Sequence, residues 1–123
     1  MSLAAEIVAH AKADAGLISA CGGRIYAITL KQGATLPALT YQRIDGPRIV
    51  SHSGDSGLSH PRYQIECWAA TYLEAEALAE DVIAAFSGDL GWATGFPEAG
   101  PDFYEADPER YRRVVDVQFW VRG

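Results

Sequence analysis

The sequence has 123 residues, which fits one domain with one core, and we expect residues 1–123 to form a single domain. Apolar residues make up 49% of the chain and charged residues 21%, the composition of an ordinary soluble globular protein. The formal net charge of −6 argues against a protein that grips nucleic acid by its phosphates. The apolar runs are far shorter than the ~20 residues that span a bilayer, so we expect no membrane partner.

The N-terminal segment predicts a helix followed by two short elements. Residues 3–13 are expected to be helical, because Leu3 and Ile7 lie on one face and Ser2 is a suitable N-cap. A helical turn at 17–21 and an extended segment at 24–30 are expected to follow.

The next segments predict strands connected by a long loop. Residues 38–44 form the first strand, since Leu36-Pro37 favours an extended chain, and residues 48–50 continue the sheet briefly. Residues 51–60 read SHSGDSGLSH, and we interpret this serine- and glycine-rich stretch as a loop.

The centre of the chain predicts a strand that leads directly into a helix. Residues 62–69 alternate, with Ile65 and Cys67 on the apolar side, as in a half-buried strand. Residues 71–86 then change to helical spacing. Thr71 followed by Glu74 fits a capping box at the start of this helix.

The C-terminal part predicts a second long connection and a hairpin. The connection, at 88–100, carries Trp92 and Phe96, which either fold back onto the core or contact a neighbouring subunit. The hairpin consists of strands at 102–106 and 110–121, and the second of these alternates between one buried and one polar face.

These elements predict an α+β fold in the order helix, strand, strand, helix, strand, strand. We expect an antiparallel four-stranded sheet with two helices packed on one face. The predicted core consists of Leu3, Ile7, Leu39, Tyr41, Ile65, Cys67, Leu78, Val82, Phe86, Val115, Val117 and Phe119.

No pattern in the sequence predicts a catalytic, cofactor or metal site. Residues 54–57 read GDSG, as around a protease nucleophile, but a nucleophilic serine needs a base held by a third group. His52, Asp55 and His60 lack the spacing of a known metal site, so two surface histidines in a loop are the favoured interpretation. The two cysteines are expected to be reduced and unpaired.

Trp68 and Trp120 fall on the polar side of their strands, near the ends. Two interpretations stay open: the rings cover part of the sheet within the monomer, or they anchor a contact between proteins, where tryptophan is enriched.

Four segments together resemble the tail-completion, or tail-terminator, proteins of long-tailed phages, prophages and gene transfer agents. Residues 68–79 read WAATYLEAEALA, residues 17–26 end in GGRIY, residues 36–41 read LPALTY, and residues 111–121 read YRRVVDVQFWV. The order and spacing of the four segments carry the resemblance, which covers most of the chain.

The resemblance implies a structural virion protein without enzymatic activity. Such a protein caps the tail tube as a ring of six copies at the head–tail junction, after synthesis in the bacterial host cytoplasm. Its partners are further copies, the major tail-tube protein and a head-completion or connector protein, while DNA passes through without specific binding. The candidate interface residues are Trp68, Trp120, His52, Asp55, His60, Trp92 and Phe96.

Two other functions are compatible with the sequence. One is a small hydrolase that uses the His52–His60 loop. The other is a binding module that accepts an edge strand from a partner.

Overall fold

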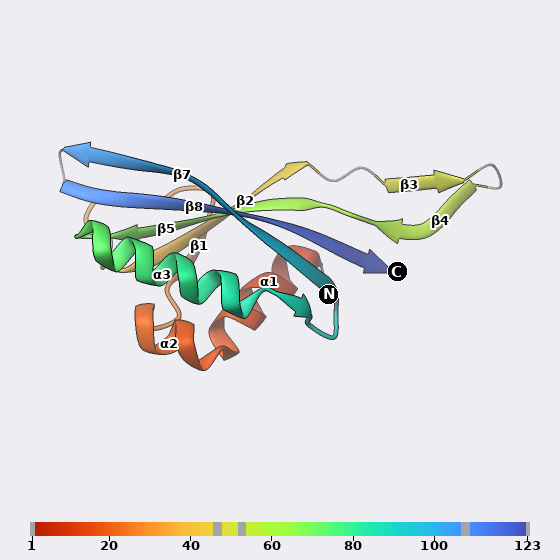
Figure 1. The fold of residues 1–123 in the computed structure, drawn as a ribbon, viewed down its shortest axis with the longest axis horizontal. Coiled ribbons are helices and arrows are strands. Elements are labelled where there is room, and N and C mark those ends of the chain that lie inside the picture. The colour runs from red at the N-terminus through yellow and green to blue at the C-terminus, as the bar shows by residue number, and fades with distance from the viewer. Residues whose placement is uncertain (1, 46–47, 52–53, 107–108, 123) are drawn as a thin grey trace.

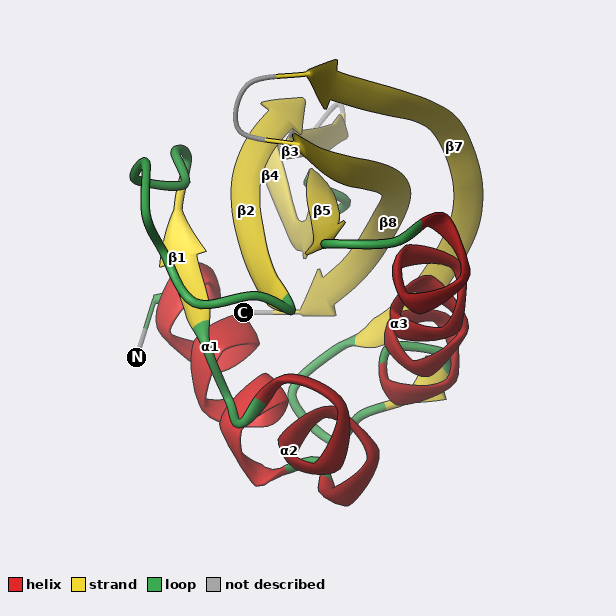
Figure 2. Cartoon of the chain, turned by 90° about the vertical axis from the view of Figure 1, so that its left-hand side faces the viewer, coloured by secondary structure: helices red, strands yellow, loops and turns green. Residues whose placement is uncertain are grey.

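The structure is a computed structural model, which describes residues 2–45, 48–51, 54–106 and 109–122. These residues form three helices and eight strands, with the helices on one side of a curled sheet (Figures 1 and 2). The elements are α1 (Leu3–Ala13), α2 (Ala15–Cys21), β1 (Ile25–Ala27), β2 (Ala38–Asp45), β3 (Arg48–Ser51), β4 (Gly54–Ser59), β5 (Arg62–Ala69), α3 (Tyr72–Ala85), β6 (Gly88–Asp89), β7 (Thr94–Ala106) and β8 (Glu109–Arg122).

Strand β8 lies at the centre of the sheet. On one side it pairs with β7 along its length, and on the other it pairs first with β5 and then with β4. Strand β2 continues the antiparallel sheet beyond β5, and β1 adds to β2 in parallel. Strands β3 and β4 form a hairpin that extends the β2 and β5 pair beyond the core (Figure 1).

The predicted α+β class is confirmed, but the four-stranded antiparallel sheet and the predicted order of elements are wrong. The sheet is mixed because β1 is parallel to β2. Most of the expected loop at 51–60 belongs to the β3–β4 hairpin, and the expected connection at 88–100 contains β6 and the first half of β7. Alternation of apolar and polar residues is the sequence signal for a strand, and glycine, serine and proline interrupt it in both segments. The strands form nevertheless, because backbone hydrogen bonds to neighbouring strands hold them.

The helix starts follow their sequence signals. The Ser2 hydroxyl accepts a hydrogen bond from the Ala5 N–H at 3.1 Å, and the Thr71 hydroxyl accepts one from the Glu74 N–H at 3.2 Å. The second half of the predicted capping box differs, because the Thr71 hydroxyl donates to Glu74 Oε1 at 3.0 Å. Both arrangements place an acceptor at the helix N-terminus, where backbone N–H groups lack partners.

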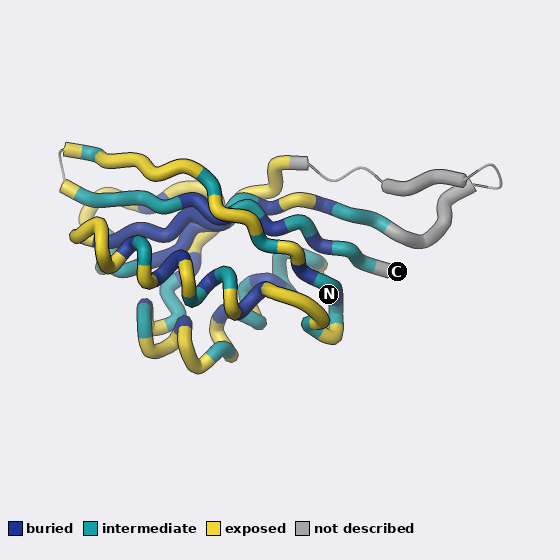
Figure 3. Tube along the Cα trace, viewed as in Figure 1, coloured by how far each residue is buried: buried dark blue, intermediate teal, exposed yellow. Residues whose placement is uncertain are grey.

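The core lies between the helices and the sheet, as Figure 3 shows. Every predicted core residue is buried except Leu3 and Tyr41, which pack against the core from partly exposed positions. Ala75 and Ala79 are also buried on α3, and their small side chains let the helix approach the sheet closely. None of the helices in the described ranges is long and apolar enough to cross a membrane.

The sheet face opposite the helices is less polar than predicted. A second cluster of Leu30, Ala38 and Trp68 is buried there, because the segment after β1 folds back over this face. Val114 is also buried, since Gly100 of β7 lies so close that an added Cβ would be 3.1 Å from the Val114 side chain. The curl of the sheet thus covers part of a face that alternation alone assigns to solvent.

Candidate subunit interface

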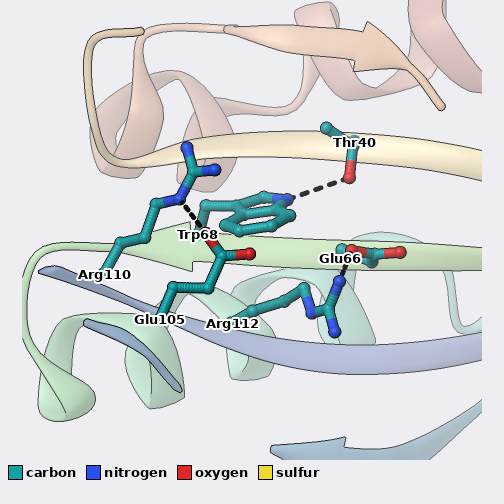
Figure 4. A network of polar contacts seen from close by, with 6 residues as sticks. All are labelled: Thr40, Glu66, Trp68, Glu105, Arg110 and Arg112. Atoms are coloured by element: carbon teal, nitrogen blue, oxygen red, sulfur yellow. Dashed lines mark hydrogen bonds and ion pairs between the residues drawn. The ribbon is translucent and has the colours of Figure 1, made fainter. Parts of the chain in front are cut away.

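Trp68 lies near the end of β5, in the second cluster. Its side chain is only 5% exposed, and its indole N–H donates a hydrogen bond of 3.0 Å to Thr40 Oγ1 (Figure 4). Guanidinium carbons of Arg110 and Arg112 lie 4.6 and 5.2 Å from the ring centre. These are cation–π distances. The interpretation that the ring covers the sheet within the monomer therefore fits the geometry.

Both arginines are also held by carboxylates. Arg110 Nε lies 2.8 Å from Glu105 Oε2, and Arg112 Nη1 lies 3.1 Å from Glu66 Oε2 (Figure 4). The Glu66 residue is buried, so its charge needs this partner. Arg110 and Arg112 are thus each held between the Trp68 ring and a carboxylate within the same chain.

The third arginine of this sequence cluster is paired as well. Arg113 Nε lies 2.9 Å from Asp102 Oδ1, and Arg113 Nη1 lies 3.5 Å from Glu76 Oε2. The Arg113 Nε–H direction misses the Asp102 oxygen, so this contact is an ion pair without a good hydrogen bond. The positive charges that cluster in the sequence are thus balanced within the fold, and they do not form a patch for phosphates.

Three predicted residues gather elsewhere on the helix-free face. The half-buried Trp120 ring stacks on His60 with ring centres 5.0 Å apart, and His60 Nδ1 lies 3.1 Å from Gln118 Nε2. Gln118 lines a hollow of about 270 Å³ together with Phe96, which is 54% exposed. We name Trp120, His60, Gln118 and Phe96 the aromatic patch.

A carboxylate beside the aromatic patch has a buried oxygen that accepts no hydrogen bond from the described residues. Asp116 lines the same hollow as Phe96, and its Oδ1 is buried without a hydrogen-bond partner in the described part of the chain. Buried acceptors are normally satisfied. Arg62 and Glu98 line the same hollow, which therefore carries both signs of charge.

The other predicted interface residues are not brought together. Trp92 folds back onto the core, with its ring centre 5.5 Å from that of Phe119 and 5.6 Å from that of His10. Asp55 lies in strand β4 rather than in a loop. His52 lies outside the described residues.

Among the described residues, no group of three histidine, cysteine or acidic side chains is placed to hold a metal ion. The GDSG segment lies in strand β4 rather than in a loop. Cys21 and Cys67 are both buried and free, and burial raises the pKa of each thiol.

Sequence reasoning missed a group of tyrosines beside the arginines. The Tyr111 ring contacts Tyr72 at 6.1 Å and Tyr104 at 4.9 Å between ring centres. The Tyr72 hydroxyl donates to Asp102 Oδ2 at 2.9 Å, and this hydrogen bond raises the pKa of Tyr72. The adjacent aromatics at 103–104, in a segment without apolar alternation, were the available signal.

Comparison with known proteins places this arrangement in a family. The profile of the family described as Tail completion protein gp17 matches residues 5–122. The comparison with curated proteins found no match. Among solved structures, the fold is similar to a chain of the "Virion of native gene transfer agent (GTA) particle", with 16% sequence identity, a TM-score of 0.78, and coverage of 99% of this chain and 96% of that chain. Because the profile spans nearly the whole sequence, the predicted resemblance is confirmed: the chain belongs to the tail completion protein gp17 family and is a structural protein of the virion tail.

Proposed function

We propose that this protein caps the finished tail tube as a ring, takes part in joining the tail to the head, and has no enzymatic activity. The observation that carries the proposal is the family match over residues 5–122. The fold similarity to a chain of a gene transfer agent virion supports it, since that likeness extends over nearly the full length of both chains. Six copies form the ring, and they contact the major tail-tube protein on one side and a head-completion protein on the other.

The electrostatics of the fold support free passage of DNA through such a ring. The net charge is −6 per copy, and the three clustered arginines already face carboxylates. A protein that holds DNA must offer unpaired cations to its phosphates. A ring of these subunits repels the DNA backbone and lets it slide.

The helix-free face supports contact with other tail or head proteins. The aromatic patch is partly exposed, and the Asp116 oxygen beside it lacks a partner among the described residues. Aromatic side chains next to polar groups are typical of contact surfaces between proteins. The β3–β4 hairpin reaches beyond the core and adds backbone for contact with an adjoining ring (Figure 1).

A complementation experiment tests this function. Particles are produced from a genome in which this gene is deleted, and heads and tails are counted by negative-stain electron microscopy. We expect separate heads and tails, with tails of irregular length, and joined particles once the purified protein is added. Normal joining without the protein would refute the proposal.

Trp120→Ala is the informative variant in this experiment, because it removes the stacked ring of the aromatic patch without touching the core. We expect a folded protein that joins heads and tails poorly. Leu73→Ala, at a 74% exposed position on α3, is the matched control and should restore joining fully.

A further inference from the structure

The two edges of the curled sheet differ in charge. Residues 15–44, which include β1 and lie between Asp14 and Asp45, contain three cations and no carboxylate, whereas residues 96–106 of β7 contain three carboxylates and no cation. Glu105 and Asp102 face arginines of β8, which leaves Glu98 exposed. Helix α3 packs beside β7 and carries four more acidic residues. β1 and β7 lie on opposite sides of the molecule (Figure 2).

The β1 edge carries a hollow and a strained turn. The segment after β1 encloses a hollow of about 450 Å³ lined by Tyr26, Ala27, Thr29, Lys31, Gln32, Gly33 and Ala34. Ile28, between the lining residues Ala27 and Thr29, has φ 65° and is 67% exposed, and the Thr29 N–H donates to the Ala27 carbonyl at 2.7 Å. This is a γ-turn of the rare positive-φ kind, centred on a β-branched residue. Strained backbone of this type is enriched at functional sites.

The β7 edge carries exposed aromatic side chains. Phe96, Phe103 and Tyr104 are 54%, 44% and 54% exposed, and β7 is exposed along most of its length (Figure 3). Among the described strands, β6 covers only Thr94 and Gly95 on the outer side of β7. The remaining outer backbone is an open sheet edge, which is a template for pairing with another chain.

We infer that the β7 edge of one copy docks on the β1 edge of the next copy, with an aromatic side chain of β7 seated in the hollow beside Lys31. An apolar projection and a hollow on different parts of one molecule make a head-to-tail contact, which closes into a ring when its rotation allows. The opposite charges of the edges orient the two copies. This inference rests on the proposed ring, and it leaves Trp120, His60 and Gln118 of the aromatic patch free for other virion proteins.

The test uses two variants of the full chain that each damage one edge. Lys31→Glu makes the β1 edge acidic, and Tyr104→Glu removes an exposed ring from the β7 edge and adds an acid; both positions are exposed. Sedimentation velocity over a range of concentrations gives the association state. We expect the wild type to associate, and each variant alone to associate at least about tenfold more weakly.

Mixing the two variants is the decisive step. Each mixed pair retains one intact contact, between β7 of the Lys31→Glu chain and β1 of the Tyr104→Glu chain. The remaining free edges are both damaged and both acidic, so growth stops. We expect a one-to-one dimer, and a mixture that stays monomeric would overturn the inference.

Two further variants separate contact from folding. Leu73→Glu adds an acid at an exposed position on α3 and should leave association unchanged. Ile28→Asn suits a positive φ, so its melting temperature should not fall, while its association should weaken several-fold. Unchanged association of Ile28→Asn, or equal damage by Leu73→Glu, would remove the β1 edge from the contact.

The wild type alone distinguishes this inference from the proposed function. A wild type that stays monomeric at every concentration, yet restores joining of heads and tails, would overturn the edge contact and leave the tail role intact. A wild type that associates through these edges but restores no joining of heads and tails would support the edge contact and overturn the proposed function.

Discussion

The substitution Trp68→Ala is expected to destabilise the monomer, in contrast to what the outward side of β5 suggests from sequence alone. The side chain is 5% exposed and packs with Leu30 and Ala38. Truncation of a buried tryptophan to alanine costs about 3–5 kcal/mol. Since a domain has about 5–15 kcal/mol of stability in total, about a fifth or more of it is at stake.

The variant Trp68→Phe separates the hydrogen bond from the packing. It keeps most of the buried ring but removes the indole N–H, which leaves the 1% exposed Thr40 hydroxyl without its donor. An unsatisfied buried polar group costs about 1–3 kcal/mol. We therefore expect the free energy of unfolding of Trp68→Phe to lie between that of the wild type and that of Trp68→Ala.

Urea unfolding followed by far-ultraviolet circular dichroism measures these losses, because its signal does not depend on tryptophan fluorescence. The free energy of unfolding comes from the midpoint and the slope. Trp120→Ala is the control: its ring is half-buried and stacked on His60, so we expect a loss of about 1 kcal/mol. A loss of stability below about 1 kcal/mol for Trp68→Ala would refute this account. A loss for Trp120→Ala that exceeds the loss for Trp68→Ala would refute it as well.

Three further predictions follow from single contacts. Cys21 and Cys67 are buried and their thiol pKa values are raised, so a thiol reagent at pH 8 should label neither in the native protein and both in urea; fast native labelling contradicts the described burial. Gly95→Ala should cost about 3 kcal/mol by thermal or urea unfolding, because its Cβ would overlap the Phe86 carbonyl oxygen and the backbone must move; normal stability means that β7 lies further from the end of α3. Tyr72→Phe should change stability by less than about 0.5 kcal/mol, since its hydrogen bond to a carboxylate is exposed; a loss above 1 kcal/mol would indicate a structural role.

The agreement between sequence and structure is best where one signal acts within one element. Helix α1 has the predicted bounds, and Ser2 and Thr71 cap as predicted, because capping depends on residues three positions apart. The buried face of β5 and β8 was also readable, since alternation marks the side that faces a helical layer. The same reasoning placed Trp68 and Val114 toward solvent, where they are not.

The candidate site was only partly readable. Sequence position selected Trp120, His60 and Phe96 separately, and strand pairing between β7 and β8, together with the His60–Gln118 contact, placed them on one surface. The grouping of Tyr72 and Tyr104 around Tyr111 could not be read from the sequence, because these residues come from segments that are distant along the chain.

By itself, the sequence determined the helices, the central strands, the α+β class and the family, because periodicity, helix caps and short sequence motifs are properties of neighbouring residues. Only the tertiary structure decided the parallel β1 strand, the β3–β4 hairpin and the burial of Trp68. Backbone hydrogen bonds between strands need no particular side chains, and a curled sheet can cover its own outer face. Which face of this chain is free for a partner therefore depends on contacts between residues far apart in the sequence.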